Sequence, residues 1–151
     1  MTRIRQRYGD QRGFTGGLAG LLFGFLIFLL GSFLIAYAWA VVQTKAAVVD
    51  AARQAARTYV EAPAAVDAYT SAREAAFVSL SSKGRDPARA RVDLISGGFG
   101  RCVRITIAVS YPAPVMVLPL IHLIGGSTVT GRHSEIVDPY RSGVPGIARC
   151  A

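Results

Sequence analysis

The pattern of hydrophobic and polar positions begins with one long uncharged run. No charged side chain lies between Arg12 and Lys45, and apolar residues dominate from Phe14 to Val42. A helix over this run would be roughly 43 Å long, whereas the hydrocarbon core of a bilayer is about 30 Å thick. A helix that is apolar on every face is rare in a soluble protein of this size. The run therefore predicts a transmembrane helix over residues 14–42.

Glycines recur at a regular spacing inside this run. Gly16, Gly20 and Gly24 are four residues apart, and Gly31 continues the same stripe. Two overlapping G-x-x-x-G motifs of this kind let helix backbones approach closely in lipid. Glycine is also simply more frequent in membrane helices than in soluble ones. We expect these four glycines to form a helix-packing face.

The charges before the run predict its orientation. Arg3, Arg5, Arg7 and Arg12 precede it and are opposed only by Asp10. Because basic flanks stay in the cytoplasm, the N-terminus is expected inside and everything after Val42 outside the cell membrane. The protein is thus predicted to be a single-pass membrane protein with an extracytoplasmic C-terminal domain.

A cleaved secretory signal is the alternative to an anchor. Ala36-Tyr37-Ala38 and Ala38-Trp39-Ala40 both have the small-x-small form of a cleavage site. The apolar core of a signal peptide is about 7–15 residues long, which is much shorter than this run. The length therefore favours the anchor.

A helical pattern continues beyond the run. Apolar positions at 3.6-residue spacing and an opposite polar face that includes Arg57 and Glu61 extend the helix to Glu61, and Pro63 then breaks it. A second amphipathic helix follows and ends before the charged turn at residues 83–87. The apolar side of the first helix is predicted to be Val42, Ala46, Val49, Ala56 and Tyr59 or Val60, and that of the second Val66, Tyr69, Ala76, Phe77 and Leu80.

Beyond Pro87 the period changes to two, which is typical of strands. Residues 91–95, 103–111 and 128–137 are the predicted strands, and a glycine-rich connection at residues 96–100 joins the first two. The apolar stretch at residues 115–124 is interrupted by Pro119, and we expect a loop that packs over the sheet or lies on the membrane surface. The fold class is a membrane-anchored α+β protein with a small antiparallel sheet of about three strands. Its expected parts are a cytoplasmic leader (1–13), a transmembrane helix (14–42), an extracytoplasmic helical region (43–82), a β-domain (83–137) and an irregular tail (138–151).

The net charge of +8 does not point to nucleic acid. Four of the positive charges lie in the leader and are explained by topology, and the chain has no recognisable nucleic-acid-binding module. The two cysteines, Cys102 and Cys150, both follow the span. In an oxidising compartment an even pair predicts a disulfide, although two unrelated thiols are the alternative.

No combination of residues typical of an active site occurs in the sequence. His122 and His133 lack metal-ligand spacing, and there is no G-x-S-x-G motif. The stretch Gly97-Gly98-Phe99-Gly100 is not followed by a helix, which argues against a phosphate-binding loop. We expect no catalysis, no cofactor and no metal.

These parts together resemble a known family. An arginine-rich leader ends at Gly13 and an uninterrupted apolar helix follows. Residues 51–57 then read Ala-Ala-Arg-Gln-Ala-Ala-Arg, and an alternating strand leads into Tyr111-Pro112. The chain is similar to the TadE-like proteins, which are pseudopilins or minor pilins of the tight-adherence (Flp, type IVc) pilus and secretion machinery. The resemblance covers most of the chain and is most specific at residues 51–57.

The resemblance implies a role in pilus assembly. Its implied partners are other pilin-like subunits or the inner-membrane assembly platform, together with a prepilin peptidase that cleaves between Gly13 and Phe14. Cleaved family members usually carry glutamate at the fifth residue after the leader glycine, where this chain has Leu18. Cleavage and entry into the filament therefore stay open. A membrane-anchored extracytoplasmic binding protein unrelated to pili and a secreted protein with a removed signal are the alternatives.

The predicted orientation can be tested with reporter fusions. A reporter that is active only in the periplasm should be active when it is fused after Ala151, and one that is active only in the cytoplasm should be silent. The reverse result would overturn both the orientation and the compartment in which the disulfide is expected.

Overall fold

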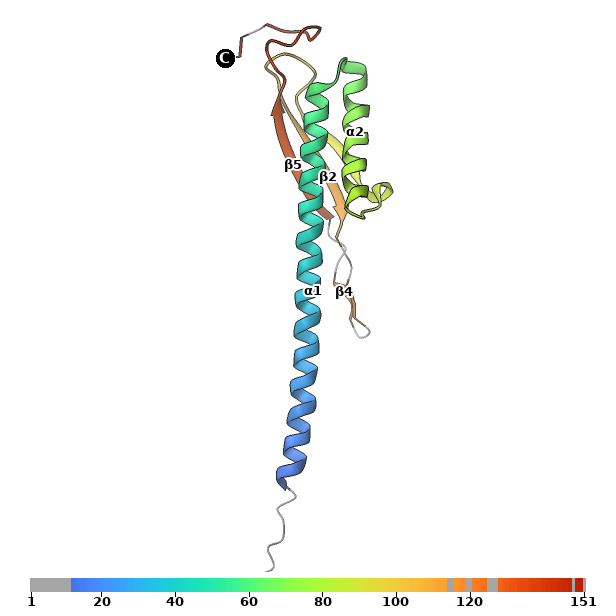
Figure 1. The fold of residues 1–151 in the computed structure, drawn as a ribbon, viewed down its shortest axis with the longest axis vertical. Helices are drawn as coiled ribbons and strands as arrows, with labels where there is room; N and C mark the ends of the chain where they lie inside the picture. The colour runs from blue at the N-terminus through green and yellow to red at the C-terminus, as the bar shows by residue number, and fades with distance from the viewer. Residues whose placement is uncertain (1–11, 114–115, 119–120, 125–127, 148, 151) are drawn as a thin grey trace, which may run out of the picture. The chain divides into compact units, whose positions relative to one another are not determined.

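The computed structural model describes residues 12–113, 116–118, 121–124, 128–147 and 149–150. The chain divides into two compact units, residues 1–38 and 39–151. The described elements, in chain order, are α1 (Arg12–Glu61), α2 (Ala65–Ser82), the 3-10 turn η1 (Pro87–Arg89), β1 (Arg91–Ser96), β2 (Arg104–Pro112), β3 (Met116–Leu118), β4 (Ile121–Ile124) and β5 (Thr128–Ile136) (Figure 1). The expected α+β fold, with a long apolar first helix, a second helix and a three-stranded antiparallel sheet, is confirmed.

In the second unit, α2 and the last part of α1 lie side by side on one face of the sheet (Figure 1). The sheet has the order β1-β2-β5, and both pairs of neighbouring strands are antiparallel. β2 is the central strand, and its residues Ile105, Ile107, Val109 and Tyr111 are buried against the helices. The predicted alternation of this strand is therefore confirmed.

Alanine dominates the contact between the helices and the sheet. On α1 the buried residues form what we call the alanine face: Ala47, Val48, Ala51, Ala52, Ala55 and Ala56. On α2 they follow one another at intervals of four: Ala68, Ala72, Ala76 and Leu80. Small side chains bring two backbones close together, so that many weak contacts replace the few large ones of a leucine-rich core.

The sequence prediction placed part of this core on the wrong side of the helices. Val42 is 59% exposed, Val49 lies at the edge of the buried face, and Val66 is 88% exposed. The prediction followed a 3.6-residue spacing, and Ala46, which it also placed on the apolar side, is exposed. The predicted positions that are buried are Ala56, Tyr59, Ala76 and Leu80.

Residues 116–124 differ from the expected loop. β3 and β4 form a two-stranded antiparallel hairpin in which Met116 pairs with Ile124 and Leu118 with Ile121. Pro119, which lies between them in the sequence, is outside the described residues. The prediction took this proline as an interruption of the apolar stretch and expected a loop, whereas the described residues before and after it form two short strands.

The closest approach of sheet and helix is at Gly131 of β5. A Cβ atom added there would lie 2.8 Å from the carbonyl carbon and oxygen of Val48 and 2.8 Å from the Cα of Val49. These are backbone atoms of α1, which cannot rotate away as a side chain can. Lys45 also donates a hydrogen bond to the carbonyl of Thr130, next to this contact. Glycine at position 131 therefore sets the distance between β5 and α1.

Replacing Gly131 with alanine should lower the free energy of unfolding of the second unit by about 1–3 kcal/mol, because strand and helix must separate. The measurement is urea unfolding of the full chain in detergent micelles. Gly98→Ala is the matched control, since a Cβ at Gly98 meets no atom within 4 Å. Equal stability of the two variants would contradict the proposed contact.

Candidate functional site

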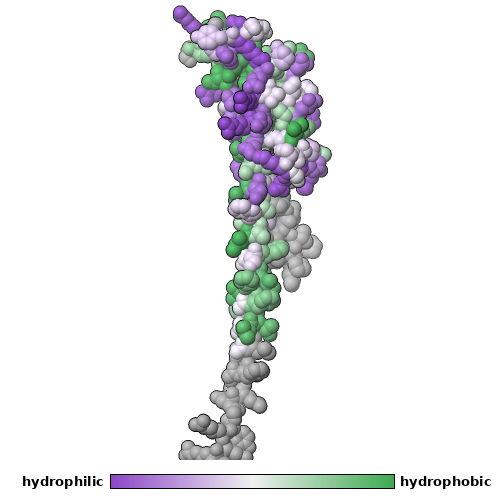
Figure 2. Space-filling view, viewed as in Figure 1, coloured by the Kyte–Doolittle hydropathy of each residue, from purple (hydrophilic) through white to green (hydrophobic). Residues whose placement is uncertain are grey.

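The first candidate site is the apolar surface of α1 between residues 17 and 36. Leu21 is 74% exposed, Phe28 68% and Ile35 70%. None of the most apolar window of this helix is buried, and the helix is long and apolar enough to cross a membrane. Figure 2 shows the hydrophobic side chains gathered over this stretch and the hydrophilic ones over the second unit. The exposed large side chains of the stretch are Leu21, Leu22, Phe23, Phe25, Leu26, Ile27, Phe28, Leu29, Leu30, Phe33, Leu34 and Ile35.

The glycine stripe lies within this surface. At about 100° per residue, Gly16, Gly20, Gly24 and Gly31 fall within an arc of roughly 80° on the helix. A Cβ added at Gly20, Gly24 or Gly31 would meet no atom within 4 Å. The backbone of the described residues along this stripe is therefore uncovered by the chain itself, and the surroundings of Gly16 lie outside the described residues.

The predicted processing site is at the beginning of α1. The backbone of Gly13 and Phe14 is helical, and Leu18 lies slightly more than one turn further along. The side chains of Phe14 and Leu18 lie outside the described residues. The structure thus gives the backbone conformation at the site and leaves the cleavage itself as a prediction.

A polar groove between α1 and α2 is a second candidate. It encloses about 670 Å³ and is open to solvent. Lys83 pairs with Asp50 across it, but these side chains are 37% and 54% exposed, so the pair adds at most about 1 kcal/mol. The sequence prediction did not find this groove, because it forms only when α2 folds back on α1. Its lining residues are Asp50, Arg53, Gln54, Arg57, Ala75, Val78, Ser79, Ser82 and Lys83.

The C-terminal tail is fastened to the domain by a disulfide. Cys102 and Cys150 are joined, with an S–S distance of 2.04 Å, which agrees with the predicted pairing. The bridge closes a loop over a sequence separation of 48 residues. In the chain-entropy description, a loop of this size contributes about 4 kcal/mol by restricting the unfolded chain.

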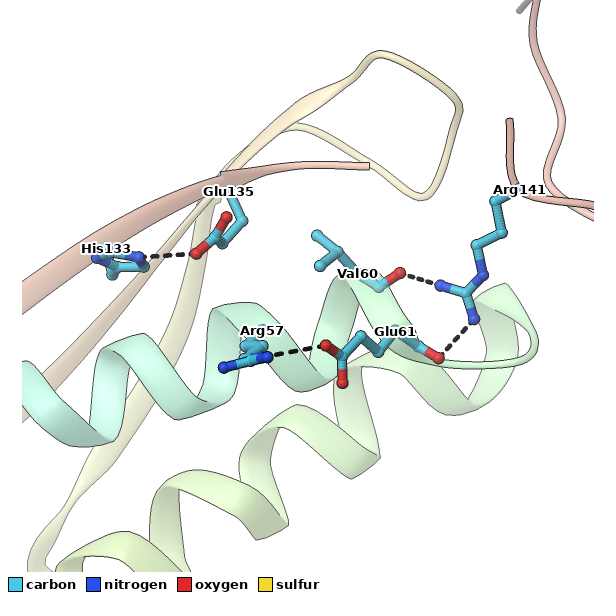
Figure 3. A network of polar contacts seen from close by, with 6 residues as sticks. All are labelled: Arg57, Val60, Glu61, His133, Glu135 and Arg141. Atoms are coloured by element: carbon cyan, nitrogen blue, oxygen red, sulfur yellow. Dashed lines mark hydrogen bonds and ion pairs between the residues drawn. The ribbon is translucent and has the colours of Figure 1, made fainter. Parts of the chain in front are cut away.

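Arg141 fastens the same tail to the end of α1. Its guanidinium donates hydrogen bonds to the carbonyls of Val60 and Glu61 (Figure 3). It also donates one to the carbonyl of Ala62 at 2.6 Å. The last carbonyls of a helix have no partner within the helix, so a side chain that binds three carbonyls at this end satisfies much of their need. The guanidinium also lies 6.0 Å from the ring centroid of Phe99. The sequence predicted only an irregular tail, because a single arginine does not reveal which groups its side chain will bind.

Two pairs of polar side chains lie near the end of α1 and on β5. Arg57 pairs with Glu61 at 3.1 Å, as expected from their spacing, and His133 Nε2 lies 3.0 Å from a carboxylate oxygen of Glu135 (Figure 3). Burial raises the pKa of the Tyr59 hydroxyl, so the fold loses stability as the pH rises above about 10, the ordinary pKa of this group. His122 lies in β4, and its side chain is outside the described residues.

Two further predictions concern the glycine-rich connection and metals. Gly97 has a φ of +83°, and a Cβ there would lie 2.3 Å from the carbonyl oxygen of Arg104. The glycine is thus required by the turn between β1 and β2. Among the residues that the structure describes, no group of three or more His, Cys, Asp or Glu residues could hold a metal ion.

Comparison of the chain with models of protein families, with curated proteins and with solved structures found no match. A function for this chain therefore has to be inferred from its residues and their geometry.

Removing the disulfide should destabilise the second unit. We expect the double variant Cys102→Ser with Cys150→Ser to lose about 2–4 kcal/mol of unfolding free energy in micelles. Wild-type protein unfolded in the presence of a thiol reductant should show the same loss, while the reductant should leave the double variant unchanged. A double variant as stable as the oxidised wild type would contradict this role of the bridge.

Proposed function

We propose that the chain is a membrane-anchored, pilin-like (TadE-like) protein that takes part in assembling a tight-adherence (type IVc) pilus or a related secretion system. The observation that carries the proposal is that α1 has two roles. Its first part exposes a continuous apolar surface, and its last part forms the buried centre of a small α+β domain. The sequence resemblance stated above supplies the biological setting of the proposal.

The apolar surface of α1 supports the membrane anchor. Removing one Leu, Ile or Phe side chain from water contributes about 1.5–3 kcal/mol, and twelve such residues lie between positions 21 and 35. No described part of the chain covers them. A bilayer would do so, and the basic leader would keep the N-terminus in the cytoplasm. The disulfide is compatible with a second unit in an oxidising compartment outside the membrane.

The glycine face is the proposed working surface. Pilin-like proteins assemble by packing their N-terminal apolar helices together, and Leu18 provides no carboxylate to set the register of that packing. Gly16, Gly20, Gly24 and Gly31 then provide close backbone approach, which gives van der Waals contacts that lipid does not match. The partner is another pilin-like subunit or the inner-membrane assembly platform.

The processing state separates this proposal from its alternatives. In the intact mass of the purified protein, a start at Phe14 would indicate cleavage by a prepilin peptidase after Gly13. A start at Trp39 or Val41 would indicate a removed signal peptide, and an uncleaved chain would indicate a permanent anchor.

An extracytoplasmic binding protein unrelated to pili is the second candidate function. The polar groove between α1 and α2 favours it, because a solvent-open cavity of about 670 Å³ is large enough for a small polar ligand. Replacing Arg53 and Gln54 with alanine would then impair ligand binding, while the contacts of the span with its partner stay intact. For the pilin-like function the opposite result is expected.

The helix-packing proposal predicts that Gly20→Ile abolishes crosslinks between the span and its partner. The branched side chain blocks close approach, whereas the segment stays apolar and inserted. Crosslinking should be measured from photoreactive residues in the span of the full chain in its membrane, together with surface pili if the host makes them.

Ala36→Ile is the matched control for this variant. It adds side-chain volume about 160° around the helix from Gly20, on the opposite face. We expect the control to keep its partner crosslinks. If Gly20→Ile keeps them as well, the glycine face has no part in assembly and recognition must lie in the second unit.

A further inference from the structure

Five basic residues gather at one end of the second unit. We call them the basic edge: Lys45, Lys83, Arg85, Arg89 and Arg91. Four of them lie in the nine residues from position 83 to position 91, where Asp86 is the one carboxylate. From the sequence alone, residues 83–87 were predicted only to form a charged turn. The structure shows where this turn lies in the second unit.

On the helix side, the edge lies beside the beginning of the part of α1 that belongs to this unit. α2 runs antiparallel to the last part of α1 (Figure 1). The end of α2 therefore lies beside the first residues of α1 that belong to the second unit. Lys83 and Arg85 line a shallow cavity together with Gln43, Ala46 and Ala47 of α1. Trp39, at the end of the predicted span, is only one turn before Gln43.

On the sheet side, strand register brings the remaining residues to the same level. Arg91 of β1 pairs with Ser110 of β2, and Ser110 pairs with Thr130 of β5. The carbonyl of Thr130 in turn accepts the hydrogen bond from Lys45. The basic edge therefore runs across α1, the end of α2 and the sheet at one level.

Few carboxylates neutralise this edge. Asp50 pairs with Lys83, and Asp86 accepts a hydrogen bond from the backbone N–H of Ala88 at 3.0 Å. Asp93 lies two residues beyond Arg91 on the exposed side of β1. Among the described residues, the ion pairs do not include Arg85, Arg89 or Arg91.

Arg89 and Arg91 are exposed, and Arg85 is partly exposed. The guanidinium of Arg89 lies 5.7 Å from the ring centroid of Tyr111, which holds it near the end of β2. Three guanidinium groups thus remain available to an anionic surface.

An uncharged connection leaves and re-enters the sheet at this same end. β2 ends at Pro112, which pairs with Thr128 at the beginning of β5. The 15 residues between them include the hairpin strands β3 and β4 and contain no Asp, Glu, Lys or Arg. An apolar connection bordered by cationic side chains is the combination found in segments that lie at a membrane interface.

We propose that the basic edge binds the anionic head groups of the membrane in which α1 is anchored, so that this end of the second unit rests on the bilayer. The inference rests on the proposed membrane anchor. It adds a lipid class, phospholipids with a net negative charge, and a surface that recognises them. Electrostatic attraction of this kind weakens with salt, because the Debye length falls from about 10 Å at 0.1 M to well under 5 Å near 1 M.

The experiment compares the thermal unfolding of the second unit in two lipid environments. The full chain is reconstituted in nanodiscs of phosphatidylcholine alone or with one third phosphatidylglycerol, and unfolding is followed by circular dichroism. A ligand that binds only the folded state raises the unfolding midpoint. We expect the anionic lipid to raise it by about 5 °C and 1 M NaCl to remove this gain, whereas inorganic phosphate added to the phosphatidylcholine discs should have no effect.

Two triple variants test whether the edge is responsible. Arg85→Gln, Arg89→Gln and Arg91→Gln together should abolish the gain. Arg73→Gln, Arg104→Gln and Arg132→Gln together remove the same net charge from exposed arginines elsewhere on the unit and should keep it. If the first variant is unfolded even in phosphatidylcholine, the single variants Arg85→Gln and Arg91→Gln replace it, and each should lose about a third of the gain.

The results that overturn the inference are separate from those that overturn the anchor. Equal midpoints in the two lipids, a gain produced by inorganic phosphate, or equal losses in the two triple variants would remove the lipid-binding role of the basic edge. Failure of the chain to float with phosphatidylcholine vesicles in a density gradient would instead contradict the membrane anchor itself.

Discussion

The close contact between the alanine face of α1 and the surfaces that cover it is the constraint on which the second unit depends. At Gly131 the strand backbone touches the helix backbone, and a single added methyl group would lie 2.8 Å from Val48. Along α2, the buried residues are alanines at intervals of four, followed by Leu80. Most buried side chains on the helix side of this core are small, with Tyr59 and Leu80 as the large ones, so its stability depends strongly on close approach of the backbones. The disulfide and Arg141 then hold the tail against the unit and the end of α1.

This constraint also bears on function, because the element that forms the core is the element proposed to lie in the membrane. α1 is one continuous helix from Arg12 to Glu61. The boundary between the two units of the chain, at residues 38 and 39, lies within this helix. The basic edge would act near this boundary, from the side of the lipid head groups.

Much of this arrangement was predictable from the sequence, since it depends on local pattern. The uncharged run, the strand alternation from residue 103 to residue 111 and the even pair of cysteines each correspond to an observed element. The sequence prediction was wrong in placing Val42 and Val66 on the buried faces of the helices. How closely a helix approaches its neighbour depends on both surfaces, and the type of a single residue does not reveal it. The groove, the target of Arg141 and the basic edge all depend on α2 folding back or on strand register. No local signal encodes these relations.

The central claim is that one continuous helix serves both as the membrane anchor and as the centre of the second unit. Hydrogen exchange of the backbone amides of the full chain in nanodiscs tests it most directly, since exchange reports the opening of each helical hydrogen bond. The account predicts slow exchange without a break from Leu21 through Trp39 and Thr44 to Tyr59. Rapid exchange confined to residues 39–46, between two protected segments, would show a hinge there and would contradict the claim.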